Sequence, residues 1–245
     1  MRRVGAFARA VPLAAIMGSF SVNAASADID IDDEKTTIFF SGGDLWRHGL
    51  SFYGGALWSP AGLDREGFVL KLLLGAGRYG YVSGAAGHPL ITGEHNVAFA
   101  LPGWRLQKDR LVVSMFAGID VQYHLLTPDD PAGSLRGIEI GIRTGVDLWF
   151  EPTSLTMIGA DASFSTVGPS YSARLAYGWR IPGSFYAGPE IGAFGLDSKY
   201  RQVRAGLHIT SFRLYDLEWS AGFGWSFDND DRSSLYGRLG VFVRK

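Results

Sequence analysis

The stretch from Leu135 to Phe150 constrains the fold of this chain more than any other part of it. Apolar side chains fill nearly every second position, at Ile138, Ile140, Ile142, Val146, Leu148 and Phe150. The positions between them carry glycine, tryptophan and charged residues of both signs. A period of two is the spacing of a β-strand, whose successive side chains point to opposite faces. About 9–11 tilted residues cross a bilayer as a β-strand, so this stretch predicts a membrane-spanning strand with its apolar face towards lipid.

The same alternation recurs from residue 36 to the end of the chain. Its apolar faces predict strands near residues 36–43, 50–58, 67–81, 97–101, 111–123, 135–150, 158–164, 171–180, 185–193, 202–209, 217–227 and 235–243. The count is about 12, an even number as in bacterial outer-membrane barrels. The sequence therefore predicts an all-β fold, an antiparallel up-and-down outer-membrane β-barrel. The alternative is a soluble β-sandwich or lipocalin-like barrel, in which the aliphatic face turns inward.

Glycine and proline set the expected limits of two strands. Gly42-Gly43-Asp44 predicts a turn or bend at the end of the first strand. Pro102-Gly103 predicts a bulge or an early end of the fourth strand. Just before it, Val97, Phe99 and Leu101 predict the apolar face of that strand.

The lengths of the connections predict which rim of the barrel faces the periplasm. Outer-membrane barrels have short periplasmic turns and longer outer loops. Counted back from the C-terminus, the short connections fall near residues 108, 152, 182–183 and 214, and the longer ones near 85–89, 129–131 and 228–231. The segment Ser59–Glu66 departs from this rule, because it is long for a periplasmic turn.

The first 27 residues have the features of a secretory signal peptide. Arg2 and Arg3 give a positive N-terminal end, and the run from 11 to 20 is mostly apolar. We therefore predict a signal peptide at 1–27, an acidic leader at 28–35 and a β-barrel domain at 36–245, with the protein in the bacterial outer membrane. A retained membrane anchor is the alternative, although the apolar run is short for a membrane span.

Composition argues against several kinds of site. The chain has no cysteine, so it has neither disulfides nor thiolate metal sites. The formal net charge is −1 and no single-sign patch indicates nucleic acid. The histidines are scattered without the spacing of metal ligands. The sequence therefore predicts no metal and no cofactor.

The polar faces of the predicted strands point into the barrel lumen. The candidate network consists of Lys71, Asp120, Glu139, Arg143, Asp147, Asp161, Arg174, Glu190, Arg204, His208, Glu218 and Arg238. A barrel of this size leaves little open space if these side chains pair, because wide channels belong to larger porins. Two interpretations stay open, a salt-bridged plug that holds the barrel's shape and a lining that passes or binds a polar ligand.

Aromatic residues provide a second set of candidates. Tyr79, Tyr81, Trp149 and Tyr186 are possible saccharide-stacking residues, since amphipathic aromatic rings offer a large apolar face. The alternative is that each of them packs in the barrel or belongs to an interfacial girdle.

The evidence for catalysis in the sequence is weak. His208 and Thr210 share a face, and Ser220 or Ser226 is expected nearby across the strands. This is a loose Ser–His pairing, and no third group that would orient the histidine is identifiable. We predict no catalytic residue, and a barrel hydrolase is the less favoured alternative.

Several motifs resemble those of a known family. In order along the chain they are Asp64-Arg65-Glu66-Gly67-Phe68, Gly75-Ala76-Gly77-Arg78-Tyr79-Gly80-Tyr81, Pro128-Asp129-Asp130-Pro131 followed by Gly137-Ile138-Glu139-Ile140-Gly141, Glu151-Pro152, Ala187-Gly188-Pro189-Glu190 and Arg204-Ala205-Gly206-Leu207-His208. Together they resemble the cellulose biosynthesis protein BcsS family over nearly the whole mature chain. One departure is the C-terminus, where Phe242 is followed by Val243-Arg244-Lys245 and the terminal aromatic residue common in outer-membrane strands is missing.

The resemblance implies an exported component of bacterial cellulose production, expected in the outer membrane. Its implied partners are outer-membrane lipid and the cellulose chain or other cellulose-export components. The leading hypothesis is a non-enzymatic accessory protein of cellulose biosynthesis or export. A small-solute porin is the second hypothesis, and a barrel enzyme acting on lipid or polysaccharide is the third.

Overall fold

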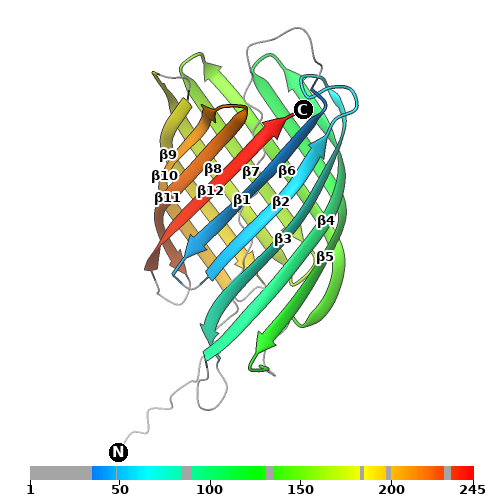
Figure 1. Ribbon diagram of the computed structural model, residues 1–245, viewed down its shortest axis with the longest axis vertical. Coiled ribbons are helices and arrows are strands. Elements are labelled where there is room, and N and C mark those ends of the chain that lie inside the picture. The colour runs from blue at the N-terminus through cyan, green and yellow to red at the C-terminus, as the bar shows by residue number, and fades with distance from the viewer. Residues whose placement is uncertain are drawn as a thin grey trace, which may run out of the picture.

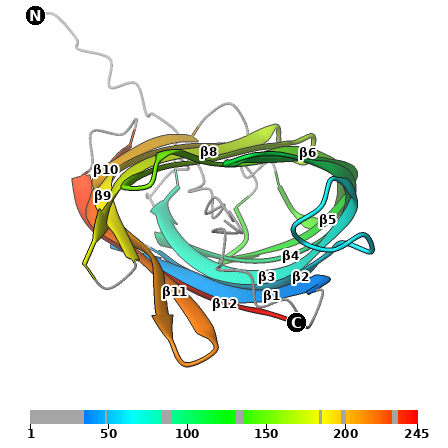
Figure 2. The same cartoon turned by 90° about the horizontal axis from the view of Figure 1, so that it is seen from above.

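Twelve antiparallel strands close into a single barrel (Figures 1 and 2). The computed structural model describes residues 35–47, 49–83, 90–130, 135–182, 185–196, 200–228 and 233–245. The strands are β1 (Thr37–Trp46), β2 (Gly49–Trp58), β3 (Gly67–Val82), β4 (Leu90–Lys108), β5 (Leu111–Thr127), β6 (Gly137–Thr153), β7 (Thr156–Ser165), β8 (Ser170–Ile181), β9 (Phe185–Leu196), β10 (Tyr200–Leu214), β11 (Leu217–Asp228) and β12 (Ser233–Arg244). Each strand pairs with its neighbours in sequence, and β12 pairs with β1 to close the barrel.

The predicted up-and-down barrel is therefore confirmed. The stretch that led to it is β6, and its two faces divide as the alternation predicts. Ile138, Ile140 and Ile142 are 70%, 72% and 60% exposed on the outside, whereas Arg143 and Trp149 are buried inside. The predicted signal peptide lies outside the described residues, as does the leader apart from Lys35. Within the described parts of the chain, no helix has the length and apolar character needed to cross a membrane.

Two predicted strand limits are wrong. β1 continues through Gly42-Gly43-Asp44 to Trp46, because this segment pairs without interruption with both β2 and β12. β4 likewise runs past Pro102-Gly103 to Lys108. Its ladder with β5 skips Leu101 and Pro102 and then resumes in the same register. Proline has no backbone N–H to donate to a neighbouring strand. The β4–β5 ladder is paired on both sides of Pro102, so the strand continues through this gap.

The predicted lipid-facing side of β4 is also wrong. Val97, Phe99 and Leu101 are at most 8% exposed and point into the barrel. Ala98 and Trp104 lie on the outer face of the same strand. Both faces of this part of β4 are apolar, so alternation alone does not distinguish inside from outside; the register with β3 and β5 decides it.

β1 begins and β12 ends at one rim of the barrel, which we call the terminal rim. The amides of Thr36 and Thr37 both donate to the carbonyl of Lys245, at 2.8 Å. Connections at this rim are short, as at 109–110, 154–155 and 215–216, whereas those joining β3 to β4 and β5 to β6 at the opposite rim are longer. The C-terminus lies at the upper end in Figure 1.

The exceptional segment Ser59–Glu66 closes the terminal rim. Leu63 is 2% exposed and packs with apolar side chains inside the barrel. Its amide donates to the carbonyl of Lys35 at 2.8 Å, and its carbonyl accepts from Nη1 of Arg105 at 2.5 Å. The segment is long because it folds over the opening instead of turning directly into the next strand.

Apolar clusters fill the barrel at both ends. The distal cluster, at the rim away from the termini, consists of Trp46, Tyr79, Ile91, Leu126, Leu135, Val167, Leu196 and Tyr236. The terminal-rim clusters consist of Ile38, Phe40, Leu57, Leu63, Val69, Leu73, Val97, Phe99, Leu101 and Phe116, and of Val112, Trp149, Met157 and Tyr186. The distal cluster draws side chains from around the barrel, including β1, β5, β9 and β12. Buried apolar side chains therefore lie inside the barrel of Figure 2 near each of its ends.

The outer wall is apolar between two bands of aromatic side chains. Large exposed hydrophobic residues occur on all twelve strands, with Leu74 69%, Ile140 72% and Phe223 63% exposed. Exposed aromatic residues near the terminal rim are Trp58, Trp104, Trp179 and Tyr215, and those near the opposite rim are Tyr123, Phe164, Tyr171, Trp225 and Phe227.

Candidate functional site

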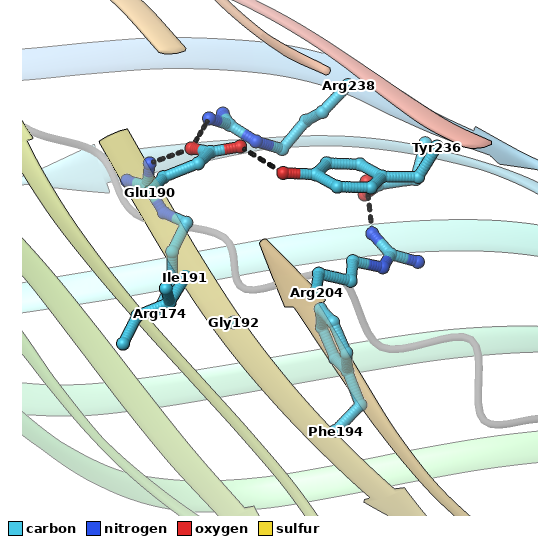
Figure 3. A pocket seen from close by; sticks show the side chains of 9 residues that line it. Arg174, Glu190, Ile191, Gly192, Phe194, Arg204, Tyr236 and Arg238 are labelled. Atoms are coloured by element: carbon cyan, nitrogen blue, oxygen red, sulfur yellow. Dashed lines mark hydrogen bonds and ion pairs between the residues drawn. The ribbon is translucent and has the colours of Figure 1, made fainter. Parts of the chain in front are cut away.

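The polar interior is organised around one carboxylate, Glu190 of β9. Alternation directs it inward together with Arg174 of β8 and Arg238 of β12 (Figure 3). Its Oε2 atom accepts from Arg174 Nη1 at 3.2 Å and from Arg238 Nη2 at 2.8 Å, and its Oε1 atom accepts from the Tyr236 hydroxyl at 3.0 Å. All three charged side chains are less than 10% exposed. Three donors thus satisfy a buried carboxylate that would otherwise be costly.

Arg204 of β10 joins this cluster to the distal aromatic side chains. Its guanidinium donates to Asp44 Oδ1 and to Gln202 Oε1, both at 3.0 Å. The same group lies 4.4 Å from the ring centroid of Phe194 and 5.0 Å from that of Tyr236. Cation–π attraction is stronger when the charge is removed from water, so Arg204 fits a dry site. The remaining space in this cluster is about 20 Å³, room for about one water molecule.

A second network surrounds Asp120 of β5. Its Oδ2 atom accepts from Arg143 Nη2 and from Gln122 Nε2, both at 2.8 Å, and from Ser165 Oγ at 2.5 Å. The Oε1 atom of Gln122 lies 3.2 Å from His124 Nε2. This network ties β5, β6 and β7 together across the interior.

The remaining predicted interior residues form smaller groups. Lys71 Nζ lies 2.8 Å from Asp147 Oδ2, and Arg174 Nε lies 3.1 Å from Asp161 Oδ2. Glu218 lies 3.9 Å from Arg244. Across the described residues the structure thus brings together Lys71, Asp120, Arg143, Asp147, Asp161, Arg174, Glu190, Arg204 and Arg238 in buried ion pairs, and Glu218 in a looser one.

Two of the predicted residues stand apart from these ion pairs. Glu139 lies on the inner face of β6, is half-buried, and has no ion pair among the described side chains. His208 is buried and its Nε2 atom lies 3.2 Å from the carbonyl oxygen of Tyr177.

Sequence reasoning missed three buried charges that belong to the interior. Asp44 was assigned to a turn, Arg105 lies beyond the expected end of β4, and Arg244 lies in the C-terminal departure from the family pattern. The signal that would have found them is parity. When the alternation of inward and outward side chains in each strand is continued past its glycines or its proline, all three residues fall on the inward face.

Three of the four predicted saccharide-stacking residues are buried. Tyr79, Trp149 and Tyr186 are 3%, 2% and 2% exposed. Trp149 and Tyr186 pack edge to face with 5.9 Å between ring centroids, and Tyr79 belongs to the distal cluster. The side chain of Tyr81 lies outside the described residues. The structure therefore uses the three described rings for packing, which argues against sugar binding at them.

The loose Ser–His pairing is not formed. His208 is directed at a backbone carbonyl, and the hydroxyl of Ser226 pairs with Ser234 Oγ at 2.8 Å. Ser220 of β11 is paired with Gly240 of β12, and its hydroxyl lies close to that glycine. Among the described residues, no group of three or more histidine, aspartate or glutamate side chains is placed to hold a metal ion.

The family model described as "Cellulose biosynthesis protein BcsS" matches residues 38–245. No curated protein matches the chain.

Three of the similar solved structures are barrels at low sequence identity. The "KdgM porin" shares 10% identity, with a TM-score of 0.46, over 84% of this chain and 98% of that one. The "KdgM porin in complex with disordered oligogalacturonate" shares 9% identity, with a TM-score of 0.47, over the same shares of the two chains. The transport unit of the autotransporter AIDA-I from Escherichia coli shares 9% identity, with a TM-score of 0.48, over 89% of this chain and 93% of that one.

Proposed function

The chain belongs to the family of cellulose biosynthesis protein BcsS, and from this premise we propose that it is a non-enzymatic outer-membrane barrel that assists cellulose production or export. Its partners in this role are outer-membrane lipid and other components of the cellulose machinery. The single observation that carries the role is a barrel that is apolar outside and filled inside.

The outer wall supports a place in a membrane. Soluble monomers rarely expose contiguous apolar patches of more than a few hundred Å², whereas here large apolar side chains are exposed on every strand. Aromatic residues near both rims fit the two interfacial girdles of outer-membrane barrels. In a soluble barrel the aliphatic face of β6 would point inward, and Ile138, Ile140 and Ile142 point outward. The soluble alternative is therefore disfavoured.

The interior supports an accessory role over that of an open pore. Apolar clusters occupy both ends, the segment Ser59–Glu66 folds over the terminal rim, and buried ion pairs cross the middle. The cavity beside Glu190 is about 20 Å³, room for about one water molecule. Packed carboxylates with several donors each also argue against a free general acid or base, which favours a non-enzymatic role.

We expect the purified barrel to show no porin-like conductance in planar lipid bilayers. The physical reason is that buried ion pairs cross the described interior and apolar clusters lie near both ends. A matched positive control is a larger porin reconstituted by the same protocol. Stable single-channel steps of porin size from this protein would contradict the filled interior and favour the small-solute porin.

Deletion of the gene tests the proposed role in the cell. The expected result is reduced or misplaced cell-associated cellulose, measured by dye staining, with recovery when the wild-type gene is returned. The protein is expected in the outer-membrane fraction with heat-modifiable gel mobility, and its mature N-terminus is expected between Ala25 and Asp28. Unchanged cellulose in the deletion strain would remove the pathway role, and a soluble periplasmic protein would remove the barrel's membrane placement.

A further inference from the structure

The β10–β11 hairpin leaves the barrel wall at the terminal rim. The register between β10 and β11 shifts between Ile209 and Phe212, where Ser211 adopts a positive φ of 61°. Such a bulge bends a strand. Pairing of β10 with β9 ends at Thr210. Beyond it the hairpin is held by its own two strands, by pairing of β11 with β12, and by the ring of Phe212, which packs edge to face on Phe185 of β9 with 5.8 Å between ring centroids. Figure 2 shows β11 and its turn projecting outward from the barrel.

The projecting hairpin has one apolar and one charged face. Phe212 pairs with Trp219, and Leu214 pairs with Leu217, so these four side chains share a face. Phe212, Leu214 and Leu217 are 43%, 48% and 37% exposed.

On the other face, Arg213 pairs with Glu218, and their charged groups lie 3.8 Å apart. Glu218 is also 3.9 Å from Arg244, which holds the charged face towards the barrel interior and the rim.

The apolar face of the hairpin continues the outer wall. Trp219 is followed on the outward side of β11 by Ala221, Phe223 and Trp225. When a wall bends outward at its rim, its outer face turns towards the membrane surface and its inner face turns towards water. The apolar side chains of the hairpin are then directed at lipid, and Arg213 and Glu218 are directed at the aqueous side.

Tyr215 at the tip is the first residue of the two-residue turn between β10 and β11. It is 92% exposed and has a φ of 56°, a left-handed conformation that bulky side chains rarely adopt. Its ring makes no described aromatic or hydrogen-bond contact. Asp109, the first residue of another two-residue turn at this rim, has a similar φ of 52°, so this backbone conformation belongs to the turn. The exposed ring fits a membrane surface, since tyrosine is favoured where an apolar body meets lipid and a hydroxyl meets water.

We propose that the β10–β11 hairpin from Phe212 to Trp219 is an in-plane membrane anchor that lies on the bilayer surface at the terminal rim, with its apolar face in the boundary between headgroups and acyl chains. The proposal rests on the proposed outer-membrane location. By the short turns at this rim, the surface concerned is the periplasmic one.

Single-cysteine spin labels test the anchor, because the chain has no native cysteine. The full barrel is reconstituted in phospholipid vesicles with a nitroxide at Leu214, Leu217 or Arg213. Asp109, in another two-residue turn at the same rim, is the matched control, and Ile140 reports the barrel wall. Heat-modifiable mobility confirms that each variant is folded. The measurement is the ratio of collision rates with oxygen and with a water-soluble nickel chelate.

The expected oxygen-to-nickel ratio is several-fold higher at Leu214 and Leu217 than at Arg213 and Asp109, and approaches the value at Ile140. If Leu214 and Leu217 match Asp109 while Ile140 is lipid-exposed, the anchor is overturned and the membrane barrel stands. If Ile140 is also open to the nickel chelate, the proposed membrane placement itself fails. Low accessibility of Leu214 and Leu217 to both reagents would overturn lipid as the partner and indicate packing against the barrel itself or a second copy of the chain.

Discussion

Replacing Glu190 with alanine is expected to lower the free energy of unfolding by about 3–5 kcal/mol, the usual cost of removing one partner from a buried ion pair. Arg174 and Arg238 would both stay in the interior without their shared carboxylate, and the Tyr236 hydroxyl would lose its acceptor. The measurement is urea unfolding of the reconstituted barrel, followed by tryptophan fluorescence.

The matched control for this substitution is Glu139→Ala. Glu139 is also a carboxylate on the inner face, but it is half-buried and has no ion pair among the described residues. Its removal is expected to change the free energy of unfolding by no more than about 0.5 kcal/mol. If both variants lowered the free energy of unfolding equally, the Glu190 cluster would stabilise the barrel no more than an isolated carboxylate does. That result would contradict a structural role for the cluster.

The contrast between these two carboxylates shows what alternation predicts and what it does not. Period two places both Glu139 and Glu190 on the inner face, and the structure agrees. Pairing across the lumen is a different matter, because it depends on which strands face one another. Arg204 and Asp44 lie 160 residues apart in sequence and meet through barrel closure, which no local pattern contains.

The errors in strand limits have a common physical cause. Glycine and proline were interpreted as breaks at Gly42-Gly43-Asp44 and Pro102-Gly103, but both lie within strands that are paired on two sides. A closed barrel supplies two neighbours to every strand, and this support outweighs the weak local preference. The connections at 109–110 and 215–216 lie close to their predicted positions near 108 and 214, although the strand before each was predicted too short.

The apolar clusters in the lumen were the least predictable feature. Val97, Phe99 and Leu101 look like a lipid-facing side because they alternate, and the opposite side of β4 is apolar as well. An interior that mixes ion pairs with packed rings resembles the core of a soluble domain more than a channel lining. This packing favours an accessory role over transport of the glucan through the barrel.

Placing an arginine at Ile142 is expected to destabilise the barrel in phospholipid vesicles by about 2–4 kcal/mol, the cost measured for a cation on the lipid face near the bilayer middle. Ile142 is 60% exposed and lies opposite Ile119, itself 61% exposed, within the apolar wall. In water the same change at so exposed a position would be close to neutral, so the size of the effect reports the solvent around the wall.

The control is Leu155→Arg in the β6–β7 turn, where Leu155 is 63% exposed beyond the strands. Urea unfolding of both variants from vesicles is the measurement. If arginine at Ile142 lowered the free energy of unfolding no more than arginine at Leu155, the lipid-facing wall would be contradicted. Lipid around Ile142 and water around Leu155 must give the two substitutions different costs.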